Sequence, residues 1–83
     1  MELLIVNFDI KSDGFYCFVV RFGSETFLEE IIIKKGIVVY FEYSEKMQQI
    51  LCKNVSEAGN FNKLIFDIYK GFKVDFPFYI GDF

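Results

Sequence analysis

The feature that most constrains the fold is a series of four strand-like runs joined by very short turns. The runs cover residues 3–10, 15–22, 26–33 and 37–43. Asp13-Gly14, between the first two runs, is a strong hairpin signal because glycine adopts positive φ without steric cost. Strands joined by such short turns run antiparallel. The first half of the chain therefore predicts an antiparallel sheet.

Alternation within the runs predicts which residues share a face of this sheet. In the first run, a period of two residues places one set of apolar side chains together: Leu4, Val6, Phe8 and Ile10. In the third run, Glu29 and Glu30 are consecutive, so they point to opposite faces. We expect one of these two carboxylates to lie near a sheet end or beyond the edge of the core.

The period changes at Ser44, which is a good helix N-cap. Apolar side chains then recur at helical spacing: Met47, Ile50, Leu51, Val55 and Ala58. Gly59 follows at the position where glycine commonly ends a helix. The pattern predicts one helix near residues 44–58, packed on one face of the sheet.

Two further strand-like runs close the chain, over residues 63–69 and 72–80, with a turn at Lys70-Gly71. Pro77 cannot donate to a ladder of hydrogen bonds, so the last strand is either at an edge or leaves the sheet there. The predicted fold class is α+β. It has an antiparallel sheet of five to six strands and one helix, in the order ββββαββ, within a single domain of residues 1–83.

Large apolar side chains are in surplus, with 12 phenylalanines and five tyrosines among 83 residues. A helix of about 15 residues is about 22 Å long and covers only part of one sheet face. In the second run, however, both faces are apolar: Phe15, Cys17 and Val19 oppose Tyr16, Phe18, Val20 and Phe22. Either the sheet curls and buries the surplus, or an apolar patch stays exposed as a partner site.

The composition argues against catalysis. Histidine is absent, which excludes Ser–His and Cys–His nucleophilic pairs. The glycines are isolated and form no phosphate-binding motif. Cys17 and Cys52 match neither a disulfide framework nor a structural zinc site, so we expect two reduced thiols. We predict a protein that is not an enzyme and has no catalytic residue, metal or cofactor.

The charge pattern narrows the class of partner. Net charge is −3, Arg21 is the single arginine and the lysines are scattered, which argues against binding to nucleic acid or an anionic membrane. The apolar N-terminal stretch lacks a basic region, and no apolar run approaches the roughly 20 residues of a membrane helix. We expect a cytoplasmic protein whose partner, given this acidity, is basic.

The closing segment adds a resemblance. Residues 68–77, Ile-Tyr-Lys-Gly-Phe-Lys-Val-Asp-Phe-Pro, are similar to the endings of small immunity proteins of bacterial polymorphic-toxin and contact-dependent growth inhibition systems. The chain also resembles these proteins in its short length, its acidity and its lack of catalytic residues. The resemblance assigns no individual functional residue. It implies tight binding to a cognate toxin domain, often a nuclease, and a basic nuclease would complement an acidic inhibitor.

Three classes of binding protein remain open from the sequence. The first is an immunity protein, the second is a self-assembling protein whose aromatic sheet face closes a homodimer, and the third is a phage-encoded inhibitor of a host defence protein. The candidate contacts are acidic residues and tyrosines, which steer and anchor partners respectively. They are Glu29, Glu30, Glu42, Tyr43, Asp67, Tyr69, Asp75 and Tyr79.

Overall fold

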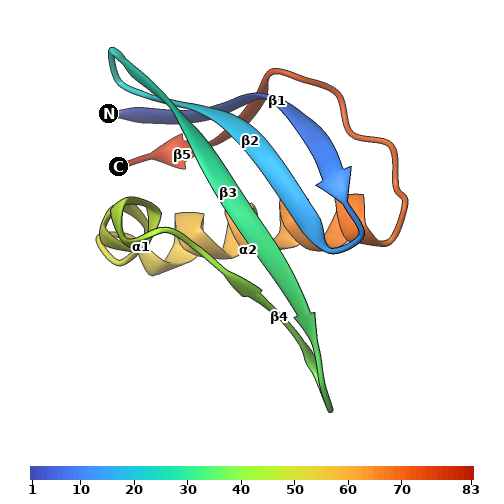
Figure 1. Cartoon of the computed structure of the whole chain (residues 1–83). Helices are drawn as coiled ribbons and strands as arrows, with labels where there is room; N and C mark the ends of the chain where they lie inside the picture. The colour runs from blue at the N-terminus through green and yellow to red at the C-terminus, as the bar shows by residue number, and fades with distance from the viewer.

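The computed structural model describes all residues, 1–83, and forms one curled antiparallel sheet with two helices. The strands are β1 (Glu2–Ser12), β2 (Phe15–Phe22), β3 (Glu25–Lys35), β4 (Val39–Glu42) and β5 (Phe78–Asp82), and the helices are α1 (Glu45–Leu51) and α2 (Val55–Tyr69). The spatial strand order is β4-β3-β2-β1-β5 (Figure 1). The predicted α+β class and antiparallel sheet of five strands are confirmed, and the element order is ββββααβ.

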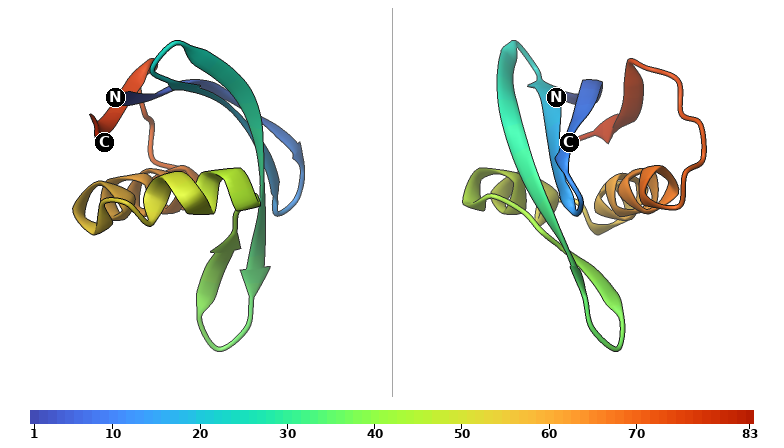
Figure 2. Two further views of the ribbon diagram at one scale, coloured as in Figure 1. Left: turned by 90° about the vertical axis from the view of Figure 1, so that its left-hand side faces the viewer. Right: turned by 45° about the vertical axis from the view of Figure 1, so that its right-hand side comes forward.

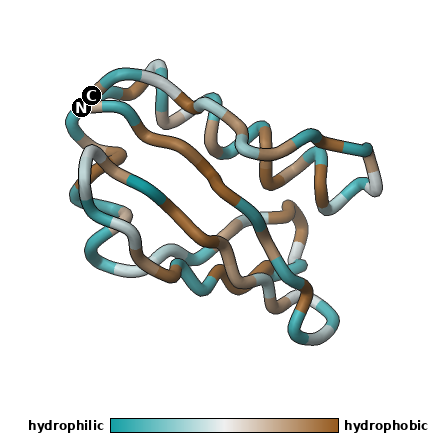
Figure 3. The backbone as a smooth tube through the Cα atoms, turned by 90° about the horizontal axis from the view of Figure 1, so that it is seen from above, coloured by the Kyte–Doolittle hydropathy of each residue, from teal (hydrophilic) through white to brown (hydrophobic).

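The sheet bends around the helices, which lie against its concave side (Figure 2). Figure 3 shows extended apolar stretches along the strands that supply this core. Phe18 of β2 and Phe61 of α2 meet edge to face with ring centroids 6.1 Å apart, and both are fully buried. Of the two outcomes considered for the apolar surplus, curling therefore buries much of it. The core is made of Leu3, Ile5, Tyr16, Phe18, Val20, Ile31, Ile33, Met47, Ile50, Leu51, Phe61, Leu64, Ile65, Ile68 and Ile80.

The first hairpin forms as predicted, with Gly14 at φ +75° in its turn. The predicted inner face of the first strand is only partly right: Phe8 packs against the core, but Leu4 and Val6 do not belong to it. Leu3 and Ile5 are fully buried, and an irregularity between Ile5 and Asn7 shifts the register so that Phe8 turns inward. Such a bulge inserts one extra residue and reverses the alternation. Leu4, before the bulge, points to the opposite side and is half-buried, and Val6 is exposed, as is Ile10 near the end of the strand.

The predicted helix over residues 44–58 is two helices. Ser44 does cap the first, because its Oγ accepts a hydrogen bond from the Met47 amide at 3.1 Å. The helical conformation then ends after Leu51. Asn54, whose backbone is extended, is the N-cap of α2, which begins at Val55. Gly59 lies inside α2 and does not end a helix. Val55, expected on the buried stripe, is 81% exposed at the start of α2.

The strand predicted over residues 63–69 is wrong, since this segment is the second half of α2. Period-two alternation put Leu64, Phe66 and Ile68 together, but helical spacing also joins Leu64 to Ile65 and Ile68, and these three are buried. Phe66 is 42% exposed as a result. Packing on the sheet overrides the strand propensity of isoleucine, phenylalanine and tyrosine here.

The last predicted strand, over residues 72–80, is shorter and later than expected. Residues 70–77 connect α2 to β5 without regular structure, and Phe72, expected to face inward, is 65% exposed. The predicted closing hairpin is therefore absent. Pro77 directly precedes β5, which pairs with β1 and forms an edge of the sheet. Neither helix combines the length and the apolar character that crossing a membrane requires.

Candidate functional site

The convex side of the sheet, which faces away from α2, carries apolar residues that the helices leave uncovered. We call it the outer face. The register places on it Phe15, the buried Cys17, Val19, Leu28, Glu30, Ile32 and Glu42, together with two cations, Arg21 and Lys34. The pairing places Phe15 opposite Ile32 and Cys17 opposite Glu30. Leu28 is 66% exposed and Ile32 is 40% exposed, whereas the neighbouring Ile31 faces the core and is fully buried.

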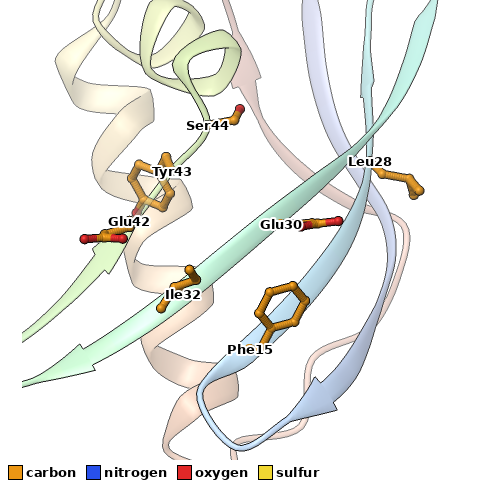
Figure 4. A pocket seen from close by; sticks show the side chains of 7 residues that line it. All are labelled: Phe15, Leu28, Glu30, Ile32, Glu42, Tyr43 and Ser44. Carbon is orange, nitrogen blue, oxygen red and sulfur yellow. The ribbon is translucent and has the colours of Figure 1, made fainter.

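An open groove of about 380 Å³ crosses this face between β2, β3 and the end of β4 (Figure 4). Its lining consists of Phe15, Leu28, Glu30, Ile32, Glu42, Tyr43 and Ser44. Four of these seven residues are hydrophobic, and the only charged members are two carboxylates. A groove with apolar walls and few polar groups is typical of a binding site.

The two groove carboxylates differ in their partners. Glu42 forms a salt bridge with Lys34 at 2.8 Å, and this hydrogen bond raises the pKa of the Lys34 ammonium. A third acidic side chain on the same side of the sheet, Asp9, is bonded to Lys11 at 3.0 Å. Glu30 is exposed and forms no salt bridge. It is therefore the acid of the groove whose charge is available to a partner.

Glu29 has a structural role on the opposite side of β3. It is fully buried in the middle of the strand, so the expectation that a sheet end would accommodate it is wrong. Its two carboxylate oxygens accept hydrogen bonds from the backbone N–H of Ser44 at 2.7 Å and from the Ser44 hydroxyl at 2.5 Å. Since Ser44 in turn caps α1, Glu29 fixes where that helix begins, and it is not accessible to a partner.

Tyr43 joins the groove to the core. Its ring packs against Phe61 with centroids 5.5 Å apart, and its hydroxyl donates a hydrogen bond to the Asn62 side chain. Burial, followed by the nearby charge of Glu29, raises the pKa of Tyr43. The ring therefore forms a fixed wall of the groove, while the hydroxyl is already used inside the protein.

The other predicted contacts lie away from this groove. Asp67 forms a salt bridge with Lys63 at 2.8 Å on α2. Tyr69 ends α2 and packs against the core under the Lys35 ammonium. Asp75 is exposed in the connection before β5, and Tyr79 is 52% exposed on the far edge strand. The structure thus brings together Glu30, Glu42 and Tyr43 but not the remaining members of the predicted set.

Apolar residues of the groove were absent from the predicted set, namely Phe15, Leu28 and Ile32. The sequence did carry a signal for them, because they fall on the face of β2 and β3 opposite Phe18 and Ile31. Alternation alone, however, does not say which of two apolar faces a helix will cover.

A second uncovered feature adjoins the groove. The end of the β3–β4 hairpin projects beyond the rest of the sheet (Figure 2). We call residues 34–40 the arm. Past Ile32, β3 has no partner in β2, so the arm is a two-stranded ribbon with β4 at a free edge. Its tip is apolar, with Ile37 fully exposed and Val38 68% exposed.

No group of three or more histidine, cysteine or acidic side chains comes together in a way that could hold a metal ion. Comparison with known proteins gives no match to a family model, to a curated protein or to a solved structure.

Proposed function

We propose that this protein is a non-catalytic inhibitor that binds a partner protein on its outer face, and specifically an immunity protein that neutralises a cognate bacterial toxin domain in the cytoplasm. The observation that carries the proposal is the open groove beside Glu30, with Leu28 and Ile32 left exposed on a sheet whose other face holds the core. Exposed apolar side chains grouped around a groove mark partner sites.

The composition of this face suits a protein partner. Interfaces combine an apolar centre with charged residues at the rim. The groove contains both kinds of side chain, since its walls include Phe15 and Tyr43 and its charges are Glu30 and Glu42. Because both charged residues of the groove lining are acidic, the groove favours a basic group on the partner. This agrees with the net charge of −3 and with a nuclease-like toxin domain as partner.

A homodimer is the second candidate, and the arm favours it. β4 leaves a free edge that ends in the exposed apolar tip, and an unprotected edge strand readily pairs with another chain. Sedimentation equilibrium separates the two candidates. The inhibitor proposal expects a monomer at micromolar concentration, and a stable dimer would favour self-assembly.

Growth rescue tests the inhibitor proposal directly. Genes that neighbour this one on its natural chromosome are expressed one at a time, with and without this protein. We expect one product to arrest growth and this protein to restore it. Leu28→Arg, on the outer face, should abolish rescue, while Val55→Arg, at an exposed apolar position on α2, should retain it. Rescue that survives Leu28→Arg, or the absence of any rescued product, would contradict the proposal.

A further inference from the structure

We infer that the groove of the outer face receives an arginine side chain of the partner protein, with its guanidinium group against Glu30. This inference rests on the proposed function and specifies the chemistry of the same site. It follows from the charge of the groove, from the side chains that flank Glu30 and from the rings in the groove walls.

The charges of the groove call for a cation. Both charged residues in its lining are carboxylates, and Lys34 already neutralises Glu42 at 2.8 Å. Glu30 forms no salt bridge, and the Lys11 charge that acts on it from farther away is already paired with Asp9. A basic side chain that enters the groove would therefore meet one free negative charge and no positive charge in the lining.

The residues beside Glu30 favour a cationic side chain that has an alkyl stem. Leu28 and Ile32 precede and follow Glu30 by two positions on β3, so all three point from the same face. Both flanking side chains are exposed. Lysine and arginine place their alkyl stems along apolar surface and keep the charged end near a polar group. A compact cation without a stem would leave these two side chains in water.

The aromatic walls favour arginine over lysine. Phe15 projects from β2 opposite Ile32, and Tyr43 lines the other side of the groove (Figure 4). The Tyr43 ring is fixed by its contacts with Phe61 and Asn62. A planar guanidinium can lie flat on an aromatic face and at the same time bind a carboxylate through two parallel hydrogen bonds, a combination that the compact ammonium of lysine does not reproduce.

A peptide titration tests the inference without knowledge of the partner. The probes are acetyl-Gly-Arg-Gly-amide and its lysine and glutamate counterparts, followed by the chemical shifts of the outer-face residues in the ¹H–¹⁵N spectrum. We expect saturable shifts at Leu28, Glu30 and Ile32 with the arginine peptide, weaker shifts with lysine and none with glutamate. Glu30→Gln should weaken arginine binding by about two- to fivefold, the range expected for an exposed ion pair.

Asp75→Asn provides the matched control, because Asp75 is an exposed acid outside the groove and the change removes its charge without altering side-chain length. No saturable shift with the arginine peptide, or equal affinity in Glu30→Gln and the parent, would overturn the inference. Growth rescue distinguishes the two proposals. If rescue were lost in Leu28→Arg but undiminished in Glu30→Gln, the result would support the inhibitor function and contradict the binding of a partner arginine at Glu30.

A second copy of the chain is the alternative occupant of the groove, and it contains a single arginine. Arg21 lies toward the other end of β2, opposite Thr26. If the protein dimerised in sedimentation experiments, and if Arg21→Gln abolished the dimer, the arginine would come from a second copy and the inference of a foreign partner would be wrong. We expect Arg21→Gln to leave both the sedimentation and the peptide titration unchanged.

Discussion

The two faces of β2 and β3 have similar apolar content and different surroundings. On the inner face, Phe18 and Ile31 are fully buried, whereas on the outer face Leu28 and Ile32 are exposed. The two faces alternate along the same strands, so strand propensity and hydrophobicity do not distinguish them. The difference arises because α2 covers only the concave side (Figure 2). An apolar face on a strand therefore becomes core or binding surface according to what packs on it.

The largest expected effect contrasts two adjacent isoleucines. Ile31→Ala removes a fully buried side chain and should lower the free energy of unfolding by about 2–5 kcal/mol, because it loses apolar burial and leaves a cavity. Ile32→Ala, on the outer face, should cost about 1 kcal/mol or less. Urea denaturation of both variants measures the difference. Equal losses would show that the outer face is packed as tightly as the core.

The two adjacent glutamates should differ next. Glu29→Gln replaces a buried carboxylate whose two oxygens each accept a hydrogen bond from Ser44, and the amide keeps only one acceptor oxygen, so one of the two bonds is lost. Because hydrogen bonds to a charged group contribute about 1.5–3 kcal/mol, we expect a loss of that order.

Glu30→Gln is the matched control and should change stability by less than about 0.5 kcal/mol, since this side chain is exposed and unpaired. Ser44→Ala should reproduce part of the Glu29 effect, at about 1 kcal/mol, the usual cost of a lost cap. If the Glu29→Gln and Ser44→Ala losses were fully additive in the double variant, the two residues would not act as one unit.

Tyr43, where the inner and outer faces meet, should make stability depend on alkaline pH. Tyrosine is neutral below its pKa, so a raised pKa means that the folded protein holds the proton more tightly than the unfolded chain does. This contribution is complete below the unfolded pKa, about 10, and is lost as the pH rises above it. Tyr43→Phe should therefore show a shallower loss of stability above pH 10 than the parent. Identical slopes in urea titrations from pH 9 to 11 would contradict this.

How much of this could be predicted depends on whether local pattern or long-range packing decides a feature. β2 has the predicted bounds, and the turn at Gly14 and the cap at Ser44 have the predicted chemistry, because each is determined by neighbouring residues. The apolar residues of segment 63–69 fit both a strand and a helix pattern. The segment is helical because, as a helix, it packs its buried residues against the concave side of the sheet.

The candidate site follows the same rule. Glu30 and Glu42 were expected contacts because acidic side chains on a strand stay in water. Glu29 belonged to the same pattern, yet its burial depends on Ser44, which is 15 residues away and comes close only when β3 and β4 pair. The bulge in β1 could not be predicted either. The residues around Asn7 alternate between apolar and polar, and this pattern does not indicate the register shift between Ile5 and Asn7.

The smallest expected effect concerns the rate at which the two thiols react in the folded protein. Both cysteines are free in the structure, and Cys52 is exposed after α1, while Cys17 is buried even though it belongs to the outer face. A reagent such as 5,5′-dithiobis(2-nitrobenzoate) should therefore modify one thiol quickly in the folded protein and the second only after denaturation. Cys52→Ser should remove the fast phase, and Cys17→Ser should not. If Cys17 reacted as fast as Cys52, the central part of the outer face would be open to water, and the groove would extend farther along β2 than its present lining.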